Sequence, residues 1–116
     1  DQRLDPKSSW AVAHLELFPV EVMRADLETL LRVPGIGPVS ARRILSARRQ
    51  TNLRFEDLKK LGVVVKRAQF FLTCGGRMRQ GKSAAPATLP VQLERMERDL
   101  LVENGVEQLS LFDSAG

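Results

Sequence analysis

Two short turns, each led by a glycine and followed by apolar residues at helical spacing, constrain the fold of this chain more than any other feature. The two copies run from Gly35 to Ile44 and from Gly62 to Phe71. In each, an alanine stands four positions after the three-residue turn, and a large apolar residue follows three positions later. Neither helix–turn–helix unit can bury a core alone, so we expect them to pack together around a pseudo-twofold axis.

Helical patterns extend on both sides of these turns. Asp26 is a suitable N-cap for the helix before the first turn, and Pro38 suits the first position of the helix after it. Residues 54–61 and 64–72 predict the two helices of the second unit, with Phe71 facing inward. Aromatic residues make up only 5% of the chain, which fits a helical core better than a β-sandwich. The sequence therefore predicts an all-α fold.

Shifts in composition divide the chain into five parts. The central part contains the two turns, and the segment after it is rich in glycine, serine, alanine and proline, as linkers are. We expect an N-terminal helical extension (1–21), the paired units as a four-helix domain (22–73), a flexible linker (74–90), a C-terminal helix (91–104) and a tail (105–116). Because the first residue is Asp1 rather than Met, we expect the chain to be a piece of a longer protein.

The charge is concentrated in the middle of the chain. Residues 22–83 carry fourteen basic and four acidic residues, a net charge of +10, whereas the whole chain has a net charge of only +4. A basic block between acidic flanks indicates a polyanionic partner, most plausibly nucleic acid. A solvated basic face without a partner is the alternative that charge alone leaves open.

The first turn has the chemistry of a phosphate site. Gly35 supplies the positive φ that a sharp turn needs, and Ile36 is expected to plug the core. Gly37 lies just before a helix, where free N–H groups and the helix dipole favour an anion. Because Gly37 has no Cβ, a phosphate can approach the backbone closely there. The residues that this chemistry predicts to contact phosphate are Gly37, Ser40, Arg42 and Arg43.

The stretch "LLRVPGIGPVSARRIL" resembles the helix-hairpin-helix motif of DNA-binding and repair proteins at every position of its pattern. That resemblance implies a tandem helix-hairpin-helix domain that binds the DNA backbone through main-chain amides, without reading base sequence. It also implies that the DNA contacts come from Gly35, Ile36, Gly37, Ser40 and Arg42. It also allows a monovalent cation on the hairpin carbonyls. In the second unit Val64 replaces the second glycine, so we expect a mainly structural hairpin in which Lys66 and Arg67 give weaker electrostatic help.

Residues 5–75 are further similar to the C-terminal region of radical-SAM proteins of DNA modification and repair, and the paired units also resemble those of competence DNA receptors. The first resemblance implies an upstream catalytic domain that holds an iron–sulfur cluster and SAM. The three-cysteine motif of that domain does not occur in this chain.

Catalytic and metal-binding patterns do not occur in the sequence, so we expect neither catalysis nor a metal site in this chain. The single cysteine, Cys74, excludes an internal disulfide and a cluster site, and a reducing, cytoplasmic location is expected. No apolar run is long enough to span a membrane.

The tail contains a second candidate motif, "QLSLF", which resembles the pentapeptide that binds the bacterial sliding clamp. The residues that would bind the clamp are Gln108, Leu109, Ser110, Leu111 and Phe112. Docking of the same segment on its own domain is the alternative.

Two functions from different classes follow. The first is a non-sequence-specific DNA-binding module of a larger repair or modification protein. The second is a protein-interaction scaffold in which the paired hairpins only dock a catalytic domain and the tail recruits the clamp.

Overall fold

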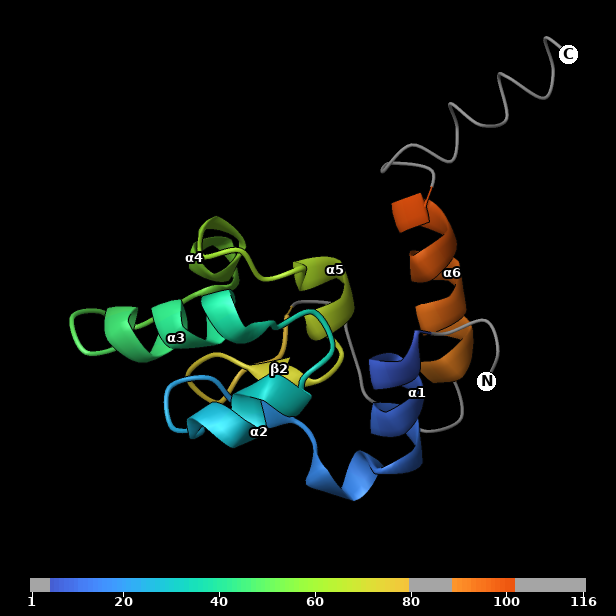
Figure 1. Cartoon of the computed structure of the whole chain (residues 1–116), viewed down its shortest axis with the longest axis horizontal. Helices are drawn as coiled ribbons and strands as arrows, with labels where there is room; N and C mark the ends of the chain where they lie inside the picture. The colour runs from blue at the N-terminus through green and yellow to red at the C-terminus, as the bar shows by residue number, and fades with distance from the viewer. Residues whose placement is uncertain (1–4, 80–88, 102–116) are drawn as a thin grey trace, which may run out of the picture.

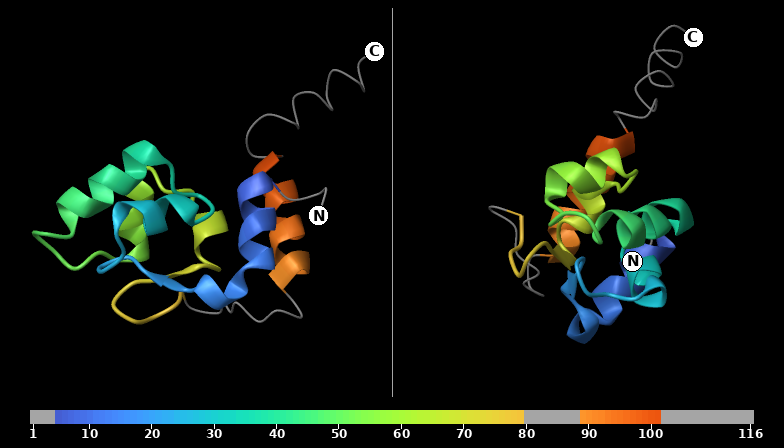
Figure 2. Two further views of the ribbon diagram at one scale, coloured as in Figure 1. Left: turned by 60° about the horizontal axis from the view of Figure 1, so that its bottom comes forward. Right: turned by 90° about the vertical axis from the view of Figure 1, so that its left-hand side faces the viewer.

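The computed structural model describes residues 5–79 and 89–101, which form mostly helical structure (Figure 1). The elements in chain order are α1 (Pro6–Ala13), the 3-10 helix η1 (Leu15–Leu17), β1 (Val20–Glu21), α2 (Leu27–Arg32), α3 (Pro38–Ala47), α4 (Phe55–Lys60), α5 (Val65–Ala68), β2 (Leu72–Thr73) and α6 (Leu89–Leu101). Helices α1 and α6 lie side by side at one end of the molecule, and α2 to α5 form the other end (Figures 1 and 2). The expected mainly helical fold is confirmed.

Acidic N-caps begin two of these helices. The Asp5 carboxylate accepts a hydrogen bond from the Ser8 N–H at 2.8 Å at the start of α1. Asp26 does the same for the Thr29 N–H at 2.9 Å at the start of α2, as its position in the sequence predicts. Each cap satisfies a donor that would otherwise have no partner in the first turn of its helix.

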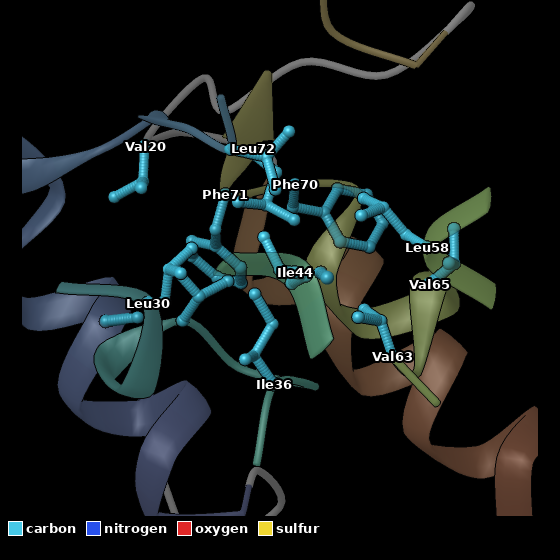
Figure 3. Close-up of a cluster of buried hydrophobic side chains, with 14 of the residues drawn as sticks. Val20, Leu30, Ile36, Ile44, Leu58, Val63, Val65, Phe70, Phe71 and Leu72 are labelled. Atoms are coloured by element: carbon cyan, nitrogen blue, oxygen red, sulfur yellow. The ribbon is translucent and has the colours of Figure 1, made fainter. Parts of the chain in front are cut away.

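The two hairpins, α2–α3 and α4–α5, meet at their turns. Gly35 and Gly62 lead the turns with φ values of +92° and +98°, so both need glycine. The Val64 N–H of the second turn donates to the Gly35 carbonyl of the first at 2.9 Å. Side chains from both hairpins gather in one buried cluster (Figure 3). The equivalent alanines, Ala41 and Ala68, are fully buried in it. The pseudo-twofold relation between the units stays a prediction.

The expectation of an all-helical chain is wrong at one place. Helix α5 ends at Ala68 instead of continuing to residue 72, and Leu72–Thr73 forms a parallel strand pair with Val20–Glu21. The reason lies in three consecutive buried side chains, Phe70, Phe71 and Leu72. A helix turns successive side chains by about 100°, so it cannot bury all three on one face, whereas extended chain inside the core can.

The Glu21 carboxylate fastens the strand pair to the turn that follows it. It accepts hydrogen bonds from the Met23 N–H at 2.9 Å, the Thr73 hydroxyl at 2.9 Å and the Gly75 N–H at 3.1 Å, and a further one from the Gly76 N–H. Burial alone would raise the pKa of Glu21, but these donors outweigh burial and hold that pKa below its usual range. The first residues of the predicted linker are therefore tied to β1.

The Glu21→Gln protein is expected to be about 1–3 kcal/mol less stable than wild type near neutral pH, because a glutamine amide has only one acceptor oxygen and leaves at least one of these backbone N–H donors without an acceptor. A lowered folded-state pKa means that ionised Glu21 stabilises the fold above its usual pKa of 4.5, and that this contribution is lost as the pH falls through the lower folded-state value. Urea unfolding of both proteins across this pH range checks the effect. Their difference should shrink in acid. The Glu16→Gln protein is the control, since Glu16 is exposed; an equal effect there would contradict the role of Glu21.

Helix α6 docks through an apolar stripe and one ion pair. Leu93, Met96 and Leu100 are buried at the spacing that predicts this helix. The Arg67 guanidinium donates to both carboxylate oxygens of Glu97, one of them at 2.7 Å, and Glu97 is only 7% exposed. The hydrogen bond to Glu97 raises the pKa of Arg67, against the effect of burial. This pair joins α6 to the second hairpin.

Candidate nucleic-acid interface

The N-terminus of α3 presents backbone donors without acceptors. The residue at its N-cap is Gly37, which has no side chain to accept from the first turn, unlike the aspartates that cap α1 and α2. Pro38 lacks an N–H, and the N–H groups of Val39 and Ser40 precede the first possible intrahelical acceptor. Among the described residues neither has a hydrogen-bond acceptor. Two adjacent donors at the positive end of a ten-residue helix thus have no acceptor within the described chain, which is the arrangement that binds anions at helix N-termini.

Space in front of these donors is open. A Cβ placed on Gly37 would meet no atom within 4 Å, and the φ of Gly37 is −102°, which any residue can adopt. The neighbouring Val39 side chain is 60% exposed. Gly37 is therefore not required by the fold, and its missing side chain leaves room for a ligand at the turn.

Ser40 shapes the turn from within. Its hydroxyl accepts from the Gly37 N–H at 3.0 Å and donates to the Gly37 carbonyl at 3.2 Å, and the residue is only 3% exposed. The sequence predicts a phosphate contact from Ser40, and the structure leaves only its backbone N–H for that contact.

Ile36 lies behind the turn, whereas Gly35 is half-buried and only its Cβ position points into the protein. A Cβ on Gly35 would come within 2.5 Å of the Val64 carbonyl oxygen, and Ile36 is 1% exposed. The Lys7 ammonium donates to the Ile36 carbonyl, so α1 places a cation of the chain itself against the hairpin. Burial lowers the pKa of Lys7, and the charge of Asp5 opposes that effect in part. Sequence reasoning missed Lys7, because its partner lies 29 residues away.

The arginines of α3 have different roles. Arg42 and Arg43 are exposed, and Arg43 makes one long hydrogen bond, of 3.5 Å, to the Leu61 carbonyl. Arg48 is instead structural, since its guanidinium donates to the carbonyls of Val22 at 3.1 Å and Ala25 at 2.6 Å. Arg42 and Arg43 therefore remain exposed on the helix that begins after Gly37, whereas Arg48 is used within the fold.

The second hairpin has no equivalent site. Val64 stands at the N-cap of α5 and uses its own N–H on Gly35, and α5 has only four residues. Lys66 is exposed, as its predicted electrostatic role requires. Arg67 is held by Glu97 and lies 3.3 Å from an Asp5 carboxylate oxygen, which directs it away from an external phosphate.

The one thiol of this chain, Cys74, is half-buried next to β2. Burial raises the pKa of the Cys74 thiol to about 12, with the charge of Glu21 adding to the effect, so this thiol stays protonated near neutral pH. No group of three metal-ligating side chains occurs in residues 5–79 and 89–101, and none of their helices is long and apolar enough to cross a membrane. The candidate clamp-binding residues 108–112 lie outside the described part of the chain.

Residues 20–47 match the family model of the helix-hairpin-helix motif. The match begins with β1, includes α2 and the open turn, and ends with α3, so the first hairpin is the part of the chain that is similar to this family. Comparisons with curated proteins and with solved structures found no match. The motif supports a nucleic-acid-binding domain, and no comparison supports the resemblance to radical-SAM or competence proteins.

Proposed function

We propose that this chain binds DNA through the phosphate backbone, without reading base sequence, and that the N-terminus of α3 makes the central contact. The observation that carries the proposal is that the N–H groups of Val39 and Ser40 have no acceptor among the described residues, while a Cβ placed on Gly37 would meet no atom within 4 Å. Both features lie within the segment that matches the motif. Main-chain donors recognise phosphate oxygens, which are the same for every base, so the contact carries no sequence information.

Arg42 and Arg43 complete this contact. Both are exposed on the helix that begins at the open turn, so their guanidinium groups can neutralise neighbouring phosphates. Arg48 and Arg67 are engaged within the protein and are not part of the proposed surface. The second hairpin holds the first turn in place through the hydrogen bond from the Val64 N–H to the Gly35 carbonyl.

DNA binding is expected to weaken steeply with salt, and Arg42→Gln should reduce the slope of log K against log salt by about 1. Each phosphate that a cation neutralises releases counterions, so removing one cation removes one such increment. Titrations of single-stranded, duplex and junction DNA over a salt series measure the slope and the preferred DNA structure. The matched control is Arg49→Gln, an exposed arginine near the other end of α3. Equal slopes for wild type and Arg42→Gln would remove Arg42 from the interface.

The same titrations separate this function from the alternative. A protein-interaction scaffold would bind no DNA while fully folded, or would bind it with little dependence on salt. In that case the basic face of the hairpins would serve a protein partner instead.

We also propose a wider setting for this activity. In this proposal the chain is the non-catalytic, DNA-binding part of a larger repair or modification enzyme. The basis is the resemblance of residues 5–75 that the sequence alone suggests, which no comparison supports. The motif at residues 108–112 supports recruitment of a bacterial sliding clamp. A DNA-binding function in turn favours a cytoplasmic location. A monovalent cation at the hairpin is also proposed, although Lys7 already occupies the Ile36 carbonyl.

A further inference from the structure

A groove of about 580 Å³ lies between α4, α5 and the end of α6. Of its lining residues, only Lys66 is among those predicted to assist DNA binding. Its floor is apolar and includes Phe55, Val63 and Leu100. Lys59 and Lys60 of α4 stand at its rim and are both exposed. The groove therefore combines an apolar interior with a basic edge.

That combination selects the chemistry of the occupant. The rim also holds Lys66 and Arg79 against one acidic residue, Glu56, so it favours negative charge. A phosphate chain would satisfy the rim but would leave the apolar floor exposed to water. An acidic peptide with large apolar side chains satisfies both parts.

A peptide of this composition follows α6 in the sequence. Residues 102–116 follow α6 directly, and Leu100 of α6 lines the groove. This segment has three acidic residues and no basic ones, and its apolar residues include Leu111 and Phe112. Phe112 lies twelve positions after Leu100, and such a length spans up to about 40 Å when extended. Phe112 can therefore reach the groove.

We propose that the groove between α4, α5 and α6 is a docking site for the chain's own residues 102–116. Leu111 and Phe112 occupy the apolar floor, and the acidic residues face the lysines at the rim. Docking within one chain has a high effective concentration, so a modest affinity suffices to keep the groove filled. A partner that binds the same segment must first displace it from the groove.

The test uses the full chain and a labelled synthetic peptide of residues 102–116. In the Leu111→Ala/Phe112→Ala protein the groove is expected to be free, and the peptide should bind it at least about tenfold more tightly than it binds wild type, whose own segment competes. Fluorescence anisotropy measures both affinities. A scrambled peptide of the same composition is expected to bind weakly.

Further variants locate the site. On the free-groove background, Lys59→Glu/Lys60→Glu should weaken peptide binding about tenfold, whereas Arg24→Glu/Arg49→Glu, an equal charge change at exposed residues that do not line the groove, should not. Adding Gly37→Asp, which is designed to remove DNA binding, should leave peptide binding unchanged, so the two proposals can fail separately. Circular dichroism confirms that each variant is folded.

The remaining outcomes would overturn the proposal. If the peptide does not bind the free-groove protein, or binds no better than its scrambled form, the groove is not a peptide site. Equal binding to wild type and to the free-groove protein would exclude residues 102–116 as the occupant and assign the groove to a separate acidic peptide. Equal losses in the two charge-reversal variants would place binding elsewhere on the surface.

Discussion

The Gly37→Asp protein is expected to bind DNA about 10- to 100-fold more weakly than wild type while remaining at least as stable. An aspartate at the N-cap of α3 can accept from the N–H groups of Val39 and Ser40, the same donors that we assign to phosphate. Hydrogen bonds to a charged group contribute about 1.5–3 kcal/mol, which sets the size of the loss. An aspartate cap is better than a glycine cap by a few tenths of a kcal/mol, so the folded state does not suffer.

The measurement pairs a DNA titration at fixed salt with urea unfolding of the same sample. Asn52→Asp makes the same change in charge at an exposed residue after α3 and should bind DNA nearly as wild type does. Gly37→Ala should have the stability of wild type, since its Cβ meets no atom within 4 Å. Its affinity for DNA should fall by an intermediate amount, because the added Cβ takes up part of the space through which a phosphate would approach the backbone. Full DNA binding by a folded Gly37→Asp protein would exclude the N-terminus of α3 as the contact.

The Gly35→Ala protein is expected to lose about 2–4 kcal/mol of folding free energy. Two costs combine at this position. The φ of +92° is unfavourable for any residue with a Cβ, and that Cβ would lie 2.5 Å from the Val64 carbonyl oxygen, which belongs to the backbone and cannot rotate away. The alanine would therefore force the two hairpin turns apart.

Gly62→Ala separates these two costs. Gly62 has a similar φ of +98°, but its nearest neighbours are side-chain atoms at 3.6 Å and beyond, an ordinary contact distance. Its loss should be about 1–2 kcal/mol, the cost of the backbone conformation alone. Urea unfolding of the two variants gives the difference in lost folding free energy, which measures the steric cost of a Cβ against the Val64 carbonyl. Equal losses would mean that the close approach of Val64 to Gly35 adds no such cost.

The first hairpin could be predicted from the sequence almost completely, because its signals are local. The positive φ of Gly35, the burial of Ile36 and the N-cap at Asp26 all follow from residues within one or two turns of chain. The open approach at Gly37 follows in the same way, since a glycine that the turn does not need leaves space for something else. The match to the motif covers this same segment.

The parts that sequence reasoning missed depend on residues far apart in the chain. Arg67 reads as one more cation of a basic helix, and only the fold brings Glu97, thirty residues later, against it. Arg48 likewise finds carbonyls more than twenty residues earlier. Local pattern specifies that an arginine is charged, but it does not specify which acceptor tertiary packing will supply. The strand at Leu72 could not be predicted for a related reason: its partner, Val20, precedes both hairpins in the sequence, whereas Leu72 follows them.

The pairing of β1 with β2 has a consequence for how the hairpins can be joined to other structures. The chain enters the paired hairpins at Val20 and leaves them at Thr73, and the strand pair holds these two points side by side along one edge. Units whose ends are adjacent tolerate insertion into a host loop and circular permutation, because their connections need not cross the unit. Residues 20–73 therefore have the connectivity of a unit that can be inserted into another protein, attached along the single edge formed by β1 and β2.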